Sequence, residues 1–206
     1  MSEPILIQKP VGASTQLMLL FHGVGSTPEN MVPLGQRLAT EFPNAVVISV
    51  PSPDASDMGS GYQWFSVRGI TEENRAQRIA AAMPRFTATI RRLQLATGTA
   101  PVQTVLVGFS QGAIMALEST QAGETLAGRV VALAGRFAQL PSRQPKDTAL
   151  HFIHGQSDQV IAVGHAVEAA DRLAKLGAKV AIDVIPLLGH GINREAEDAL
   201  VERLKA

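Results

Sequence analysis

Short runs of Val, Ile and Leu recur along the whole chain, and longer segments with helical patterning separate most of them. Most of the later runs are apolar at every position, so the strands that they form are buried on both faces. Seven strands are predicted, at residues 5–8, 16–21, 45–50, 103–107, 129–133, 150–154 and 179–185. This alternation predicts an α/β fold: a mostly parallel sheet of about seven strands with crossover helices on both faces.

Helices are predicted between the strands, at residues 28–42, 72–97, 111–121, 163–176 and 194–205. Thr71 precedes two acidic residues and is suited to be an N-cap, and Gly177 is suited to end the fourth helix. Pro84 lies inside the second helix, where its ring and missing N–H are expected to bend or divide it. The first two strands are close enough in sequence to pair as a hairpin across residues 10–15.

The composition limits the classes of protein to consider. At 206 residues the chain is long enough for one α/β domain, and we expect residues 1–206 to form a single domain without a lid domain. Its 18 basic and 18 acidic side chains balance, whereas binding to nucleic acid or to an anionic membrane needs a basic surplus. The absence of cysteine excludes a thiol nucleophile and any cysteine-ligated metal. The sequence therefore favours small neutral partners.

The start of the chain bears on its location. Residues 1–10 lack the apolar core of a secretory signal. No run approaches the roughly 20 apolar residues that cross a bilayer. We therefore expect a cytoplasmic protein without a membrane span.

The segment Gly108-Phe109-Ser110-Gln111-Gly112 lies between an apolar run and a helical stretch. Strand, Gly-x-Ser-x-Gly and helix in this order are typical of a nucleophile elbow, a sharp turn that exposes its serine. The serine adopts a strained backbone there, so the glycine positions need the smallest side chains. The helix start also directs N–H groups, chiefly that of Gln111, toward an oxygen that becomes negative during acyl transfer. The alternative is an ordinary β–α turn in which Ser110 caps the helix.

A nucleophilic serine needs a base, and position along the chain separates the five histidines. In hydrolases with this elbow the order is Ser, acid, His, with the histidine in a loop after the last strands. His190 lies there, between two glycines. Asp158 suits the acid, because it follows the predicted strand 150–154 at the carboxyl edge of the sheet. Its alternative role is that of a loop aspartate that caps a turn.

Two other chemistries fit less well. His151 and His154 are three residues apart on a strand, so their side chains point to opposite faces and do not hold one metal ion. Residues 21–25, Phe-His-Gly-Val-Gly, resemble a nucleotide loop, but Pro28 occupies the third glycine position and no Gly-Lys-Ser/Thr follows. The place of this loop after an early strand suits the second half of an oxyanion hole, with the backbone N–H of Val24 as donor. Such chemistry requires no metal and no organic cofactor.

Residues 51–70 form a long irregular segment that nevertheless holds the only Trp and the only Tyr of the chain. Ordered aromatic side chains in a long loop indicate a binding wall. The candidates to line an acyl groove or to rest against substrate are Met58, Trp64, Phe65, Arg136, Phe137 and Leu188. The alternative for each of them is plain packing.

Several of these segments occur together in one known family. In order and spacing, residues 21–25, Trp64-Phe65, Gly108 to Gly112, His154 to Val160 and Gly189-His190 resemble the phospholipase/carboxylesterase family of alpha/beta-hydrolases, which includes the acyl-protein thioesterases. The resemblance runs from about residue 16 to the C-terminus and looks closest to small bacterial esterases of the family. Ser26 and Ser66 stand where the acyl-protein thioesterases usually carry acidic residues, which favours ester chemistry over a lipidated protein substrate.

The resemblance implies an alpha/beta-hydrolase fold, a triad of Ser110, Asp158 and His190, and oxyanion donors at Val24 and Gln111. The activity implied is that of a serine carboxylesterase, which hydrolyses short- to medium-chain acyl esters through an acyl-enzyme. Two alternatives stay open: an acyl-protein or acyl-CoA thioesterase, and a non-catalytic binding module on the same fold. A homodimer is compatible with the resemblance.

Overall fold

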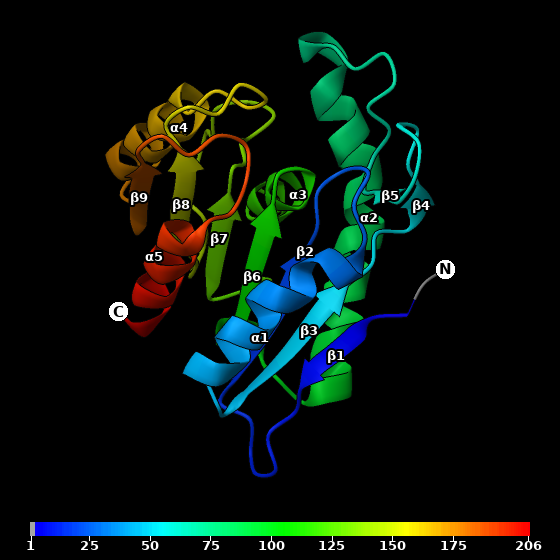
Figure 1. Cartoon of the computed structure of the whole chain (residues 1–206). Coiled ribbons are helices and arrows are strands. Elements are labelled where there is room, and N and C mark those ends of the chain that lie inside the picture. The colour runs from blue at the N-terminus through cyan, green and yellow to red at the C-terminus, as the bar shows by residue number, and fades with distance from the viewer. Residues whose placement is uncertain (1–2) are drawn as a thin grey trace.

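The computed structural model describes residues 3–206 and shows a seven-stranded sheet with helices on both faces (Figure 1). The order across the sheet is β1-β3-β2-β6-β7-β8-β9. These strands are β1 Ile5–Gln8, β2 Gln16–Phe21, β3 Ala45–Val50, β6 Thr104–Phe109, β7 Arg129–Leu133, β8 Ala149–Gly155 and β9 Val180–Ile185. Every neighbouring pair is parallel except β1 with β3, so the predicted mostly parallel sheet is confirmed.

Within the described part of the chain, five α-helices cover the two faces of the sheet (Figure 1). Helices α1 Val32–Glu41 and α5 Arg194–Lys205 pack on one face. Helices α2 Glu72–Thr97, α3 Gln111–Ser119 and α4 Gly164–Lys175 pack on the other. None of the helices within residues 3–206 has the length and apolar character that a bilayer span requires.

Strand β2 shows why both faces need a cover. Its residues Leu17, Leu19 and Phe21 belong to the core beneath α2, α3 and α4. Met18 and Leu20 belong to the core beneath α1 and α5, and all five side chains are fully buried. Burying one such side chain stabilises the fold by about 1.5–3 kcal/mol. A continuous apolar run thus suits an interior strand of the sheet, because its alternate side chains enter two different apolar layers.

The predicted hairpin between the first two strands is wrong. Strand β1 pairs antiparallel with β3, and β2 lies between β3 and β6. Strand β1 is only partly buried, which suits an edge strand with one partner. Strand β2 is buried along almost its whole length and needs a neighbour on each side. The burial of each strand, and not its closeness in sequence to the next, therefore determines which strands pair.

The helix ends follow from local chemistry. Thr71 Oγ1 accepts the Asn74 N–H at 3.4 Å and Asn74 Oδ1 accepts the Thr71 N–H at 2.9 Å, a capping box that starts α2. Helix α4 ends just before Gly177, whose φ of 82° continues the chain in the left-handed region. Helix α2 runs through Pro84 without a break, so the predicted division of this helix does not occur.

Two irregular segments differ from the prediction. Residues Pro28–Met31 form a 3-10 turn ahead of α1 instead of its first helical turns. Within residues 51–70, β4 Asp54–Ala55 and β5 Tyr62–Gln63 form a small antiparallel sheet. A backbone bridge between Ser26 and Tyr62 joins this sheet to the loop that follows β2. The long irregular segment is therefore attached to the carboxyl edge of the main sheet.

The first prediction concerns Gly112 in α3, whose added Cβ would lie 2.3 Å from Phe21 O at the end of β2. Gly112→Ala is expected to lower the free energy of unfolding by about 1–3 kcal/mol, because helix and strand must separate to accept the methyl group. Urea denaturation measures the change. Gly164→Ala is the matched control, since nothing lies within 4 Å of its added Cβ. An equal decrease in the free energy of unfolding in the two variants would contradict the close approach of Gly112 to the end of β2.

Candidate active site

Ser110 occupies the sharp turn between β6 and α3, with φ of 52° and ψ of −115°. Such a backbone costs a non-glycine residue about 1–3 kcal/mol. A Cβ at Gly108 would lie 2.5 Å from the backbone of Ala113, and one at Gly112 would collide with the end of β2. The Ser110 N–H donates to Leu133 O at 2.9 Å and attaches the turn to β7. The turn thus has the close approaches that the Gly-x-Ser-x-Gly pattern predicts.

His190 lies in the loop between β9 and α5, with its Nε2 2.9 Å from Ser110 Oγ. This loop crosses the end of β8, where a Cβ at Gly155 would lie 2.3 Å from Leu188 O. The imidazole packs against the ring of Phe109 at a centroid distance of 5.2 Å. Backbone contact and ring packing together hold His190 over the turn.

Asp158 follows β8, and its side chain is fully buried. Its Oδ2 accepts from His190 Nδ1 at 2.8 Å, and its Oδ1 accepts the N–H groups of Val160 at 2.8 Å and Ile161 at 2.9 Å. Burial acts to raise the pKa of the Asp158 carboxyl, but these hydrogen bonds outweigh burial and lower the pKa below its ordinary value. Ser110, His190 and Asp158 therefore form one hydrogen-bonded chain that ends in an ionised carboxylate.

A second histidine contacts Asp158. His154 Nε2 lies 3.2 Å from Asp158 Oδ2 and 2.8 Å from Ile161 O, and the side chain is fully buried. Both neighbours are acceptors, so Nε2 carries the proton. Its Nδ1 has no partner in the described part of the chain. The sequence pattern argued against a metal role for His154 and did not predict its contact with Asp158. Within residues 3–206, no three His, Cys, Asp or Glu side chains gather to hold a metal ion.

The loop at residues 22–25 lies directly against the Ser110 turn. A Cβ at Gly23 would be 3.2 Å from Ser110 Cβ. Among residues 3–206, neither the N–H of Val24 nor that of Gln111 donates to another protein group. Unpaired N–H groups beside a serine are what stabilisation of an oxyanion requires. Neither predicted donor therefore has a competing acceptor among the described residues.

Trp64 and Phe65 are buried, with 3% and 5% of their surface exposed, in the core beneath α2, α3 and α4. The indole packs edge-on against Phe86 at 5.3 Å. The Gln111 side chain connects this segment to α3, because Oε1 accepts the Trp64 N–H at 2.7 Å and Nε2 donates to Phe65 O at 2.7 Å. Trp64 Nε1 donates to His22 O at 2.9 Å. Contact of these two rings with substrate remains a prediction. The backbone of both residues and the indole N–H of Trp64 form hydrogen bonds that hold the loops around Ser110.

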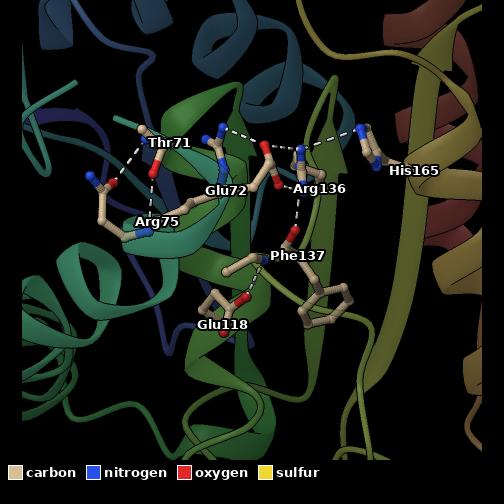
Figure 2. Close-up of polar contacts among 9 residues, drawn as sticks. Thr71, Glu72, Arg75, Glu118, Arg136, Phe137 and His165 are labelled. Atoms are coloured by element: carbon tan, nitrogen blue, oxygen red, sulfur yellow. Dashed lines mark hydrogen bonds and ion pairs between the residues drawn. The ribbon is translucent and has the colours of Figure 1, made fainter. Parts of the chain in front are cut away.

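Arg136 connects α2, the loop after β7 and α4 (Figure 2). Its guanidinium donates to both carboxylate oxygens of Glu72, at 3.2 and 2.8 Å, and its Nε donates to Phe137 O at 3.1 Å. Hydrogen bonds from Arg136 and Arg75 lower the pKa of Glu72. Burial, and then the charge of Arg136, lower the pKa of His165, whose Nε2 lies 3.3 Å from the guanidinium. The predicted substrate contact of Arg136 therefore competes with an existing ion pair.

The other predicted substrate contacts are dispersed. Met58 is 70% exposed in the loop that packs against Gly25, since a Cβ at Gly61 would lie 2.4 Å from Gly25 O. Phe137 is buried against Phe152, with ring centroids 6.3 Å apart. Leu188 packs against the core on the opposite face of the sheet. The side chains of Phe137 and Leu188 therefore do not share one surface.

The fold and the site define the class of protein. Strand β6 enters a Gly-x-Ser-x-Gly turn, the aspartate follows β8 and the histidine follows β9, which is the arrangement of an alpha/beta-hydrolase. The sequence profile of the phospholipase/carboxylesterase family matches residues 3–205. The chain belongs to this family.

Known relatives agree with this membership. The chain is 44% identical to Esterase YpfH of Escherichia coli strain K12 over 203 residues, which cover 98% of this chain and 88% of that protein. It is 26% identical to Acyl-protein thioesterase 1 of Neurospora crassa over 226 residues, which cover 98% of this chain and 92% of the relative. The crystal structure of esterase PE8 has a TM-score of 0.89 at 27% identity and covers 98% of this chain, with 96% of its own length matched. The chain is therefore a member of an esterase family.

Glu118, one residue before the end of α3, carries a half-buried carboxyl (Figure 2). Glu118 in α3 accepts the Ala138 N–H at 2.5 Å. Burial raises the pKa of Glu118, and the opposing effect of this hydrogen bond is smaller. Because the pKa is higher in the folded state than in the unfolded state, the ionised carboxyl destabilises the fold at pH values above the ordinary glutamate pKa. Below that pKa both states are protonated and the penalty disappears.

The second prediction follows from the raised pKa of Glu118. Glu118→Gln keeps an oxygen acceptor for the Ala138 N–H and removes the half-buried charge, so it is expected to raise the free energy of unfolding at neutral pH. The gain should shrink as the pH falls toward about 4, the ordinary glutamate range. Urea denaturation across this range measures it, with the exposed Glu168→Gln as control. A gain that is constant with pH would contradict the raised pKa.

Proposed function

We propose that this chain is a serine carboxylesterase that hydrolyses short- to medium-chain acyl esters through an acyl-enzyme on Ser110. The observation that carries the proposal is the hydrogen-bonded chain from Ser110 Oγ to His190, at 2.9 Å, and from His190 to Asp158, at 2.8 Å. The names of the relatives, esterase YpfH and esterase PE8, support the same class of reaction. The reaction has no step that requires a cofactor.

The position of the protons follows from Asp158. His190 Nδ1 faces a carboxylate and carries a proton, which leaves the lone pair of Nε2 directed at Ser110. As Ser110 Oγ bonds to the acyl carbonyl carbon, its proton passes to Nε2, and Asp158 stabilises the resulting imidazolium. The bond from the carbonyl carbon to the alcohol oxygen then breaks, and His190 returns the proton to that oxygen. Water attacks the acyl-enzyme by the same route and releases the carboxylic acid.

The negative charge of each tetrahedral intermediate needs its own stabilisation. The N–H groups of Val24 and Gln111 would donate to the carbonyl oxygen as it becomes negative. Gln111 is the first residue of α3, so the helix dipole favours negative charge at the same place. One such donor is worth about 100- to 1,000-fold in rate, because it is already oriented before the charge appears.

A thioesterase is the second candidate, because curated relatives are named acyl-protein thioesterase 1. The two reactions share the nucleophile, the base and the acyl-enzyme, and differ in whether oxygen or sulfur leaves. Oxygen esters and thioesters with the same acyl group therefore distinguish them by their kcat/KM ratio. A non-catalytic binding module is disfavoured by the unbroken chain of hydrogen bonds from Ser110 to Asp158.

The third prediction tests the nucleophile with p-nitrophenyl esters of increasing acyl-chain length. Ser110→Ala removes the attacking oxygen and is expected to lower kcat by about 10⁴-fold or more. The control is Ser119→Ala, which changes another buried serine of α3 and should retain activity. Circular dichroism confirms the folding of both variants.

The chain-length series also has its own outcomes. A maximum at one length in the wild type would give the size of the acyl pocket. A wild type that cleaves only the matched thioesters would favour the second candidate. Equal activity in Ser110→Ala and the wild type would exclude Ser110 as the nucleophile.

The fourth prediction tests the carboxylate. Asp158→Asn preserves the shape of the side chain but removes the charge that stabilises the imidazolium, and it no longer fixes the proton on Nδ1. We expect kcat for a cleaved ester to fall by about 10³- to 10⁴-fold, with a smaller change in KM. Asp171→Asn, on the exposed side of α4, is the matched control. Activity of Asp158→Asn within tenfold of the wild type would contradict the role of Asp158.

A further inference from the structure

His22 is a fully buried histidine that the reaction described above does not use. It follows β2 and precedes the loop that carries Val24. Its Nδ1 lies 2.7 Å from Gly23 O, and its Nε2 lies 3.2 Å from the N–H of Ser52. Both ring nitrogens therefore have a partner inside the protein.

The two partners determine which nitrogen of His22 carries the proton. Gly23 O is an acceptor, so Nδ1 is the donor, and the Ser52 N–H is a donor, so Nε2 presents its lone pair. Burial lowers the pKa of His22, against smaller opposing effects of the Gly23 hydrogen bond and the charge of Glu29. The neutral ring is the form that satisfies both contacts at once. His22 is thus held in a single tautomer and a single orientation.

Gly23 O accepts from His22 Nδ1 at 2.7 Å and, over a longer distance of 3.3 Å, from the Ser26 N–H. This carbonyl belongs to the same peptide group as the Val24 N–H. A trans peptide is planar, and its C=O and N–H point in opposite directions. A hydrogen bond that holds Gly23 O toward the interior therefore directs the Val24 N–H outward. Gly23 lies against Ser110, since its added Cβ would be 3.2 Å from Ser110 Cβ. The orientation of this one peptide decides whether the N–H reaches the substrate oxygen.

We propose that His22 is a positioning residue of the oxyanion hole: its Nδ1–H holds the Gly23 carbonyl and thereby aims the Val24 N–H at the developing oxyanion. This inference rests on the proposed esterase function. His22 touches neither substrate nor the reacting atoms.

The backbone of His22, like its ring, is hydrogen-bonded inside the protein. Trp64 Nε1 donates to His22 O at 2.9 Å, and the indole lies 5.7 Å from the imidazole between ring centroids. The N–H of Trp64 donates in turn to Gln111 Oε1 at 2.7 Å. Trp64 thus connects the loop that supplies the Val24 N–H to the residue that supplies the other donor. These buried hydrogen bonds restrict the movement of the two donors relative to each other.

The experiment compares His22→Leu with His22→Asn, two side chains of nearly equal shape. Asparagine can place an N–H donor near the position of Nδ1, whereas leucine has no donor for Gly23 O. Each variant is assayed on a p-nitrophenyl ester that the wild type cleaves and on its thionoester, in which sulfur replaces the carbonyl oxygen. Sulfur is larger and accepts hydrogen bonds more weakly, so an oxyanion hole built for oxygen favours the ester.

For His22→Leu we expect kcat on the ester to fall about 10- to 100-fold with KM nearly unchanged, part of the value of one donor. For the thionoester kcat should fall far less. The ratio of kcat on the ester to kcat on the thionoester should therefore decrease by about tenfold or more. His22→Asn should restore most of that preference. A merely structural role would lower both rates together and leave their ratio unchanged.

The controls separate the failure of this inference from the failure of the proposed function. His151→Leu removes a half-buried histidine of β8 and should leave the ratio of the ester rate to the thionoester rate at the wild-type value. His22→Ala provides the same comparison as His22→Leu if the latter does not fold. A wild-type ratio in a folded His22→Leu or His22→Ala variant would overturn the positioning role alone. No cleavage of any ester by the wild type would overturn the proposed function, and with it this role.

Discussion

The strained backbone of Ser110 depends on close approaches between main-chain atoms on both sides of the turn. Gly112 lies in contact with the end of β2, and Gly108 lies against the start of α3. The loop after β2 passes so close to Ser110 that a Cβ at position 23 would lie 3.2 Å from Ser110 Cβ, a tight contact. The strain, about 1–3 kcal/mol, persists because β2, β6 and α3 are buried and cannot separate to relieve it. The same packing brings the predicted oxyanion loop beside the serine.

Three histidines around this turn, His22 and His154 buried and His190 half-buried, each have a neighbour that determines which ring nitrogen carries the proton. Asp158 places it on Nδ1 of His190, and Gly23 O places it on Nδ1 of His22. For His154 the acceptors Ile161 O and Asp158 Oδ2 place it on Nε2. In a water-poor interior such hydrogen bonds are stronger than in solvent, and an unpaired group is costly. Rings fixed in this way present either a donor or a lone pair in one direction, which proton transfer and oxyanion binding both require.

Much of this arrangement was predictable because its signals are local. A glycine-flanked serine between a strand and a helix, and polar residues just beyond strand ends, were enough to place Ser110, Asp158 and His190 at one edge of the sheet. The pairing of β1 was not predictable, because it depends on how many partners each strand needs and not on sequence distance. The burial of Trp64 stayed one of two alternatives for a similar reason: its partners Phe86 and Gln111 are distant in sequence, and an aromatic residue in a loop indicates order without showing what it packs against.

The charges next to the turn bear on the kind of substrate that fits. Gly135 lies against Ala113, three residues after Ser110, so the loop that carries Arg136 borders the turn. The guanidinium of Arg136 is engaged by both carboxylate oxygens of Glu72 and lies within 3.3 Å of His165 Nε2. To bind the phosphates of an acyl-coenzyme A, this cation would have to leave an ion pair with a carboxylate whose own pKa is lowered by the contact. A neutral acyl ester makes no such demand. Because the Glu72 side chain is 62% exposed, breaking this ion pair costs no more than about 1 kcal/mol, and the pairing of Arg136 adds only a small preference for the proposed ester.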